Sequence, residues 1–182
     1  SIDLSNGAAT VMPYRQFFIY MTPPTGGELM DDADWVEMVF THEYMHVLHM
    51  DQAGGFPAGL RSVLGRWFFT FPQVFNPSWV SEGYAVWAET DNASAVGRGQ
   101  SALYDAMMRA EVMNGLKGLS ELSFYGYSGT DWPYGQSYLY GLYFFQFVEA
   151  NWGKDKVREF IAAWNRNIIP FRMDARAKQV FG

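Results

Sequence analysis

The 182-residue sequence contains no cysteine, and this absence excludes disulfide bonds and thiolate metal sites. Any metal ion bound by this chain must therefore be held by histidine, aspartate or glutamate side chains. Histidine is also scarce, with three residues in the whole chain, so a pattern that uses two of them is less open to chance. The lack of cysteine fits any cellular compartment and does not decide the localisation.

Positive charge is in deficit as well, because 13 lysine and arginine residues stand against 19 aspartate and glutamate residues. A nucleic-acid surface needs a basic face, so a net charge of −6 argues against a nucleic-acid partner. No run of about eighteen uncharged apolar residues occurs, and we expect no membrane span. The N-terminal residues show neither a signal-peptide pattern nor an initiator Met, so we expect the chain to be a piece of a longer protein.

Apolar residues, in contrast, make up 49% of the chain, which is ample for a packed core. Residues 2–21 are rich in β-forming residues, and Phe17-Phe18-Ile19-Tyr20 predicts a buried strand. Helical spacing dominates the rest of the chain. The predicted helices cover residues 32–51, 60–64, 100–113, 134–152 and 154–165, and a further helix follows Pro77-Ser78. The helix at 32–51 is apolar on nearly every side, so we expect it to be buried through the domain centre.

The sequence His42-Glu43-Tyr44-Met45-His46 matches the H-E-x-x-H pattern. Residues four apart lie one above the other on a helix, so both imidazoles project toward a single ion. Zinc accepts imidazole nitrogens at about 2.0–2.1 Å and leaves a position for water when the protein supplies three ligands. Glu43 stands about 100° around the helix from His42, beside the metal, where its carboxylate takes a proton from that water. The alternative is a chance match, with two histidines simply packed in a helix.

A third ligand must come from another part of the chain. His49 lies on the same helical face, but about 10.5 Å along the axis from His42 at 1.5 Å per residue. We therefore expect His49 either to contact the ligands without binding the metal itself or to have a structural role. The metzincin pattern places another histidine ten residues after the first, and this chain has Gln52 there. That pattern fails.

The segment that contains Trp79, Glu82, Gly83 and Glu89 resembles the W-x-x-E-G-x-x-x-x-x-E segment of the gluzincins. This metallopeptidase group includes thermolysin and the aminopeptidases related to leukotriene A4 hydrolase. The resemblance implies that Glu82 is the third zinc ligand and that Glu89 orients a ligating histidine. The alternative for Glu89 is an ordinary exposed acid on a helix. The separation of His46 from Glu82 is longer than in those aminopeptidases, which an insertion rich in Gly, Pro and aromatic residues explains.

Pro133-Tyr134-Gly135-Gln136-Ser137 resembles the P-Y-x-K-G segment of the same aminopeptidases. The resemblance implies that Tyr134 donates a hydrogen bond to the oxyanion of the transition state. Tyr138 and Tyr140 are neighbouring alternatives for this donor.

Asn6, Gly7 and Ala8, which precede the metal helix, are candidates for an edge strand that pairs with an extended substrate, as in thermolysin-like domains. The G-x-M-E-N sequence, with which the aminopeptidases hold a free substrate N-terminus, is absent. Endopeptidase action is therefore the expected activity.

More narrowly, the chain is similar to bacterial gluzincin domains that precede a TolB-like β-propeller. The shared features are Asp34-Trp35, HEYMHVLHMDQ, PSWVSEGYAVWAET, Gly97-Arg98-Gly99, Met108-Arg109-Ala110-Glu111 and WPYGQSYLYG. This resemblance implies an extracytoplasmic location, in the periplasm or at the cell surface, and a C-terminal propeller in the full-length protein. Arg98 and Arg109 receive no function from the sequence.

These observations predict a single α+β domain over residues 1–182, mostly helical and thermolysin-like. Strands occupy residues 1–22, the metal-binding core residues 31–92 and a helical part residues 93–182. The expected function is zinc-dependent hydrolysis of peptide bonds in a peptide or protein substrate, with one zinc ion and Glu43 as general base. Two alternatives remain: a catalytically silent module of the same fold that serves a partner domain, and a zinc hydrolase of a non-peptide bond.

Overall fold

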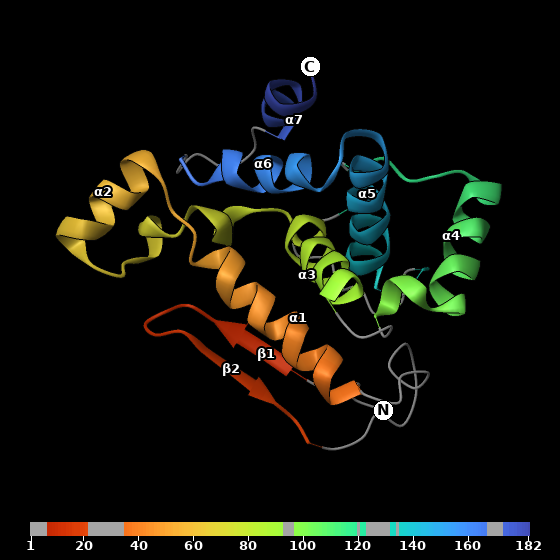
Figure 1. Cartoon of the computed structure of the whole chain (residues 1–182), viewed down its shortest axis with the longest axis horizontal. Coiled ribbons are helices and arrows are strands. Elements are labelled where there is room, and N and C mark those ends of the chain that lie inside the picture. The colour runs from red at the N-terminus through yellow and green to blue at the C-terminus, as the bar shows by residue number, and fades with distance from the viewer. Residues whose placement is uncertain are drawn as a thin grey trace.

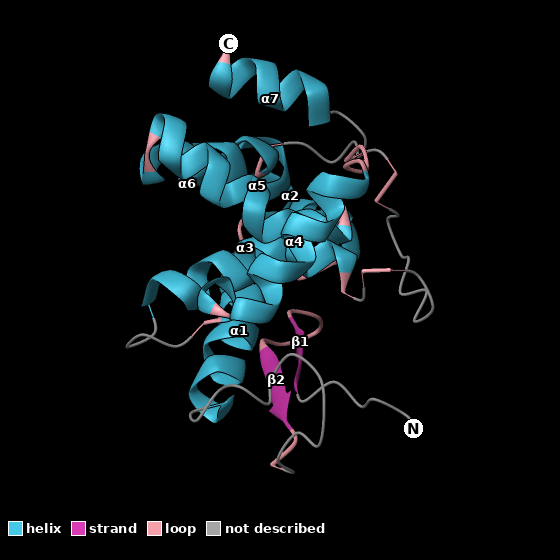
Figure 2. Cartoon of the chain, turned by 90° about the vertical axis from the view of Figure 1, so that its right-hand side faces the viewer, coloured by secondary structure: helices cyan, strands magenta, loops and turns pink. Residues whose placement is uncertain are grey.

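The computed structural model describes residues 7–21, 35–92, 97–119, 121–122, 132–133, 135–166 and 173–182. Within these residues, two β-strands form one small sheet and seven α-helices form most of the body (Figure 1). The prediction of an α+β fold that is mostly helical is confirmed. The hairpin and α7 (Met173–Phe181) lie at opposite ends of the molecule in both views (Figure 2).

The sheet is an antiparallel hairpin of β1 (Gly7–Thr10) and β2 (Gln16–Ile19), with Gly7 opposite Ile19. Phe17 faces α1, where its ring lies 5.1 Å from that of Phe40. Phe18 points to the other face of the sheet and is 56% exposed. The prediction of a buried strand here was wrong, because only one face of the hairpin is covered and alternate side chains point to opposite faces.

Helix α1 (Trp35–Met50) carries the H-E-x-x-H motif and confirms the predicted helix over the residues that are described. One side of α1 packs on the hairpin and another on α3. Phe40, Tyr44 and Leu48 follow at four-residue intervals along the helix, and each is about 45% exposed. The expectation of burial on nearly every side was therefore wrong, because the neighbouring elements cover only part of the helix circumference.

Helices α3 (Ser78–Asn92) and α5 (Gln136–Trp152) form the most extensive helix pair, and they cross at two glycines. A Cβ atom on Gly141 would lie 2.1 Å from the carbonyl oxygen of Trp79 and 2.6 Å from the Cα of Gly83. No side chain other than hydrogen fits at such a distance from backbone atoms. The glycine of the W-x-x-E-G segment therefore lets α5 approach α3 closely, next to Glu82.

The remaining helices and turns complete the body of the molecule. They are α2 (Gly55–Leu64), α4 (Ala102–Asn114) and α6 (Lys154–Trp164), with 3-10 turns η1 (Phe68–Thr70), η2 (Pro72–Phe75) and η3 (Arg98–Gln100). The main hydrophobic core lies among α3, α5 and α6 and includes the completely buried Phe145 and Phe160. Over the part of the chain that the structure describes, no helix combines the length and apolar character needed to cross a membrane.

Candidate metal centre

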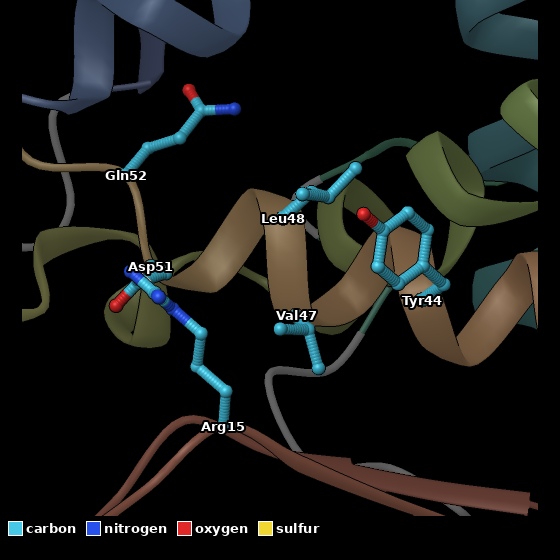
Figure 3. A pocket seen from close by; sticks show the side chains of 6 residues that line it. All are labelled: Arg15, Tyr44, Val47, Leu48, Asp51 and Gln52. Carbon is cyan, nitrogen blue, oxygen red and sulfur yellow. Dashed lines mark hydrogen bonds and ion pairs between the residues drawn. The ribbon is translucent and has the colours of Figure 1, made fainter.

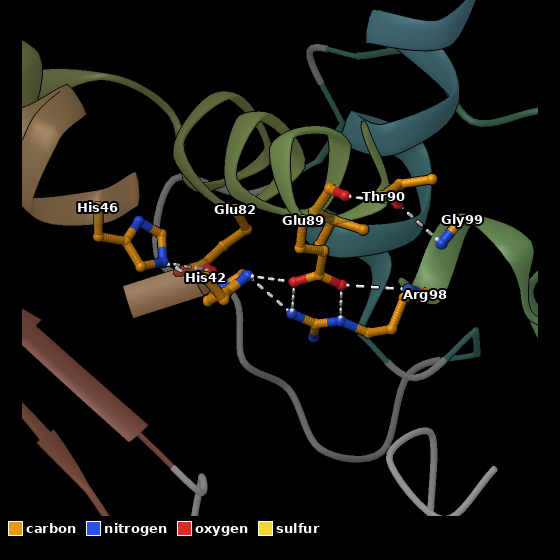
Figure 4. Close-up of polar contacts among 8 residues, drawn as sticks. His42, His46, Glu82, Glu89, Thr90, Arg98 and Gly99 are labelled. Carbon is orange, nitrogen blue, oxygen red and sulfur yellow. Dashed lines mark hydrogen bonds and ion pairs between the residues drawn. The ribbon is translucent and has the colours of Figure 1, made fainter. Parts of the chain in front are cut away.

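The candidate site lies where α1 meets α3, and two histidines and one glutamate converge there (Figure 4). His42 Nε2 lies 3.0 Å from His46 Nε2. Glu82 Oε2 lies 3.2 Å from the nitrogen of His42 and 3.1 Å from that of His46. The four-residue spacing on α1 brings the two rings together, and the packing of α3 on α1 supplies the carboxylate.

The size of this triangle fits a small divalent cation. Ligand atoms at 2.0–2.1 Å from a tetrahedral zinc ion stand about 3.3 Å from one another, close to the 3.0–3.2 Å between these atoms. Two imidazole nitrogens and one carboxylate oxygen are donors that zinc and related transition metals accept. His42, His46 and Glu82 thus form a group able to hold a metal ion.

The electrostatics of the cluster favour a positive charge at its centre. Burial raises the pKa of Glu82, but the charges and hydrogen bonds of His46 and His42 outweigh it and hold the pKa well below its usual value. Burial and Arg98 lower the pKa of His42, yet hydrogen bonds to Glu82 and Glu89 leave that pKa raised above 6.5. Glu82 is therefore an ionised carboxylate, and the space between it and the rings attracts a proton or a metal ion.

Glu89, seven residues after Glu82 on α3, lies behind His42 and is completely buried. Its Oε2 lies 2.9 Å from His42 Nδ1. Arg98 binds both carboxylate oxygens, with Nε 2.8 Å from Oε1 and Nη2 2.9 Å from Oε2. Burial raises the pKa of Glu89, but the charge and hydrogen bonds of Arg98 dominate and lower it to about 2. Glu89 is therefore a buried partner of His42 and Arg98 and not an exposed helix acid.

Two groups compete for the Nδ1 atom of His42, because Arg98 Nη2 also lies 2.7 Å from it. A guanidinium only donates, so the contacts with Arg98 and with Glu89 require opposite protonation states of Nδ1. A metal at the triangle would take the lone pair of Nε2 and leave the proton on Nδ1. In that tautomer Glu89 accepts the hydrogen bond, as carboxylates behind metal-bound histidines commonly do.

Glu43 lies between the metal triangle and β1 and is 7% exposed. A Cβ atom on Gly7 would lie 2.6 Å from both Cγ and Oε1 of Glu43, so glycine lets the strand pass directly beside this carboxylate. Burial raises the pKa of Glu43, and the nearby histidines oppose the shift without cancelling it. Gly7 and Ala8 thus lie on a strand next to the predicted general base. Asn6 falls outside the described residues.

Tyr134 also falls outside the described residues, and the structure separates the two alternatives for the oxyanion donor. The ring of Tyr138 stacks on that of His42, with centroids 5.8 Å apart, and its hydroxyl lies within the influence of the Glu82 charge. Burial and the negative charge of Glu82 raise the pKa of Tyr138, which keeps the hydroxyl protonated. Tyr140 instead donates to Glu111, away from the triangle. Of the two described candidates, Tyr138 is the one that lies at the site.

His49 has a different environment from the other two histidines. It is completely buried, its Nε2 lies 3.0 Å from Gln73 Oε1, and its ring packs edge-on to Tyr84. Gln73 in turn donates to the carbonyl oxygen of Ile161 and so ties α1 and η2 to α6. Burial lowers the pKa of His49 to about 4, so the ring is neutral. These contacts favour the structural role for His49 over support of a ligand.

An open pocket of about 410 Å³ lies near the C-terminal end of α1 and is lined by Arg15, Tyr44, Leu48 and Asp51, among others (Figure 3). Tyr44 and Leu48 stand about 200° and 240° around the helix from His42. The pocket therefore opens on the far side of α1 from the three ligands, and it does not belong to the candidate site.

Comparisons with protein families, with curated proteins and with solved structures found no match to this chain. The geometry alone brings together the three predicted ligands, Glu43 and Glu89. It also adds Arg98, to which the sequence assigned no function. The signal in the sequence was an arginine between two glycines, Gly97 and Gly99, shortly after the third-ligand segment.

Proposed function

We propose that this chain is a zinc-dependent metallopeptidase domain of the thermolysin-like gluzincin type. The observation that carries the proposal is the triangle of His42 Nε2, His46 Nε2 and Glu82 Oε2, whose sides of 3.0–3.2 Å match the edges of a zinc coordination shell. Glu43 and Tyr138 beside it are further support, because a silent metal site has no chemical need for either group.

The chemistry that zinc supplies when bound is that of a Lewis acid, which polarises a carbonyl and brings the pKa of water near 7. Glu43 takes a proton from the attacking water and passes it to the nitrogen of the leaving amine. Its burial raises its proton affinity, which suits a group that holds a proton between these two steps. The hydroxyl of Tyr138 donates a hydrogen bond to the substrate oxygen as negative charge develops there.

An extended peptide is the substrate that this surface fits best. Residues Gly7 and Ala8 lie on β1, and the strand passes directly alongside Glu43 because Gly7 has no side chain. A strand edge binds peptide backbone through main-chain hydrogen bonds and accepts many sequences. Because the chain lacks the G-x-M-E-N sequence that would hold a substrate N-terminus, we propose endopeptidase action.

The central test combines metal analysis with the variant Glu43→Gln. This variant is expected to retain about one zinc ion per chain and to lose hydrolysis of unstructured peptides, because only the proton-transfer group is removed. His46→Ala and Glu82→Ala should lose both zinc and activity. Hydrolysis by Glu43→Gln at the wild-type rate would contradict the mechanism.

A panel of unstructured peptides and simple esters, each with and without chelator, separates the alternatives. Chelator-sensitive cleavage of peptides is the expected result. Cleavage of esters alone would favour the non-peptide hydrolase, and zinc binding without any hydrolysis would favour the silent module.

A further inference from the structure

Arg98 binds the buried carboxylate of Glu89, and both oxygens of this carboxylate have two polar partners. Glu89 Oε1 accepts from the backbone N and from Nε of Arg98, at 3.2 Å and 2.8 Å. Glu89 Oε2 accepts from Nη2 of Arg98 and faces Nδ1 of His42, both at 2.9 Å. The Arg98 side chain is itself only 10% exposed. A buried ion pair of this kind is stable only when its geometry and hydrogen bonds are complete, and here they are.

The two glycines that flank Arg98 bring it this close to α3. A Cβ atom on Gly97 would lie 2.5 Å from Thr90 Cα, and one on Gly99 would lie 2.6 Å from Thr90 Oγ1. The Gly99 amide also donates to Thr90 Oγ1, at 3.1 Å. Thr90 directly follows Glu89. The close packing of η3 on α3 therefore brings Arg98 within hydrogen-bonding distance of Glu89.

The plane of the guanidinium is fixed from a further side by Tyr138, whose ring centroid lies 4.9 Å from Arg98 Cζ. Tyr138 also stacks on His42. Arg98 thus touches the tyrosine and the carboxylate that lie against the same histidine. A lysine at this position would keep the positive charge. It would lose the bidentate hydrogen bonding to Glu89 and the planar guanidinium that packs on the Tyr138 ring.

We propose that Arg98 is a positioning residue that fixes the carboxylate of Glu89 and, through it, the imidazole of His42, so that Nε2 of His42 faces His46 and Glu82, where the metal would bind. The inference rests on the proposed function for the identity of the metal. Arg98 Nη2 also lies 2.7 Å from His42 Nδ1, but a protonated Nδ1 cannot accept from it, so in the metal-binding form the link between Arg98 and the ring runs through Glu89. Without Arg98, the Glu89 carboxylate loses the bidentate contact that fixes its orientation, and the ring of His42 loses a fixed hydrogen-bond partner.

The test measures zinc affinity by competition with a chromogenic chelator, in wild type, Arg98→Met, Arg98→Lys, Glu89→Gln and the double variant. Loss of a group behind a metal-bound histidine typically weakens metal binding about 10- to 100-fold. We expect this loss in Arg98→Met and a smaller one in Arg98→Lys. If Arg98 acts through Glu89, the double variant binds zinc within about twofold of Glu89→Gln alone. Arg109→Met is the matched control, since Arg109 is exposed and pairs with Asp105.

Nitrogen-15 NMR of the zinc-loaded protein provides a readout that general destabilisation does not mimic. The protonated Nδ1 of His42 should give a signal in wild type and in Arg109→Met, and this signal should be lost or broadened in Arg98→Met. Wild-type zinc affinity in Arg98→Met overturns the proposal. So does a double variant that binds zinc much more weakly than Glu89→Gln alone, and this comparison decides the question even if Arg98→Met by itself fails to fold. Zinc binding without peptide hydrolysis in wild type would overturn the proposed function and leave the role of Arg98 standing.

Discussion

At the residue scale, the candidate site is a set of buried charges that satisfy one another. Glu82 faces His42 and His46, and Glu89 faces His42 and Arg98. Removing one member of such a set leaves another charge buried without a partner, which typically costs 3–5 kcal/mol. The informative substitutions are therefore those that remove one functional group and keep the shape of the side chain.

Tyr138→Phe is such a substitution, because it removes only the hydroxyl. If this hydroxyl stabilises the oxyanion, we expect kcat on a peptide substrate to fall about 10²- to 10³-fold with zinc content unchanged. Tyr140→Phe is the control: its hydroxyl binds Glu111 and the Lys117 amide, so its loss should cost about 1 kcal/mol of stability and leave kcat intact. Equal kcat in Tyr138→Phe and wild type would return the role to Tyr134.

The burial of His49 is expected to make the free energy of unfolding depend on pH. Burial lowers its pKa from 6.5 to about 4, so below pH 6.5 the unfolded chain binds a proton that the folded chain does not. The free energy of unfolding therefore falls as the pH decreases from 6.5 to 4, by roughly 3 kcal/mol in total. Above pH 6.5 this contribution is complete and constant.

Urea unfolding of zinc-free protein between pH 7 and pH 4.5 measures this effect. His49→Gln is the reference, because it lacks the titrating group and other ionisable groups cancel in the difference. The free energy of unfolding of the variant should depend less steeply on pH than that of wild type. Parallel pH profiles would show that His49 is protonated as easily in the folded state as in the unfolded chain.

At the scale of elements, the crossing of α3 and α5 determines what surrounds the candidate metal. Glu82 stands one residue before Gly83, and Tyr138 stands three residues before Gly141 on the other helix. The contact of the two glycines therefore sets the distance between the ligand-bearing segment of α3 and the tyrosine on α5. A wider crossing would move Tyr138 away from Glu82 and His42.

Gly141→Ala is expected to force the helices apart, because the new methyl group would meet backbone atoms at 2.1 Å and 2.6 Å. Overpacking of this kind typically costs 1–3 kcal/mol, and zinc affinity should fall with it. Gly59→Ala in α2 is the control: nothing lies within 4 Å of the added Cβ, and alanine favours a helix by about 1 kcal/mol. Urea unfolding distinguishes the two variants, and equal stability in both would contradict the close crossing.

At the scale of the whole molecule, the three candidate ligands belong to two parts of the fold. His42 and His46 lie on α1, which packs on the hairpin, whereas Glu82 lies on α3 within the main helical core. A metal ion bound by all three would join these parts. Binding to the folded chain alone raises its stability by an amount that depends on the ligand concentration and the dissociation constant.

Zinc is therefore expected to raise the melting temperature of the whole chain. At free zinc about 100-fold above the dissociation constant, the stabilisation is about 2.7 kcal/mol. For a chain of this size this corresponds to roughly 5–10 °C. Differential scanning fluorimetry with zinc and with chelator measures it. His46→Ala should show no gain, and an equal gain in that variant would place the zinc elsewhere.

Much of this architecture follows from local pattern. The helix at 35–50 and the pairing of His42 with His46 depend on spacing along a single element, so the sequence determined them by itself. Glu82 and Glu89 were found because they share one short segment with a known order of residues. The exposure of Phe18 and of the stripe from Phe40 to Leu48 was missed, because burial depends on which neighbours cover a face.

Only the tertiary structure decided how distant segments meet. Tyr138 lies at the candidate site and Tyr140 does not because α5 crosses α3 at Gly83 and Gly141. Arg98 reaches Glu89 because η3 packs on Thr90 with no side chain between them. The physical reason is general: residue spacing within a helix fixes the relative direction of its side chains. The distance between two helices, in contrast, depends on the volume of every residue at their contact.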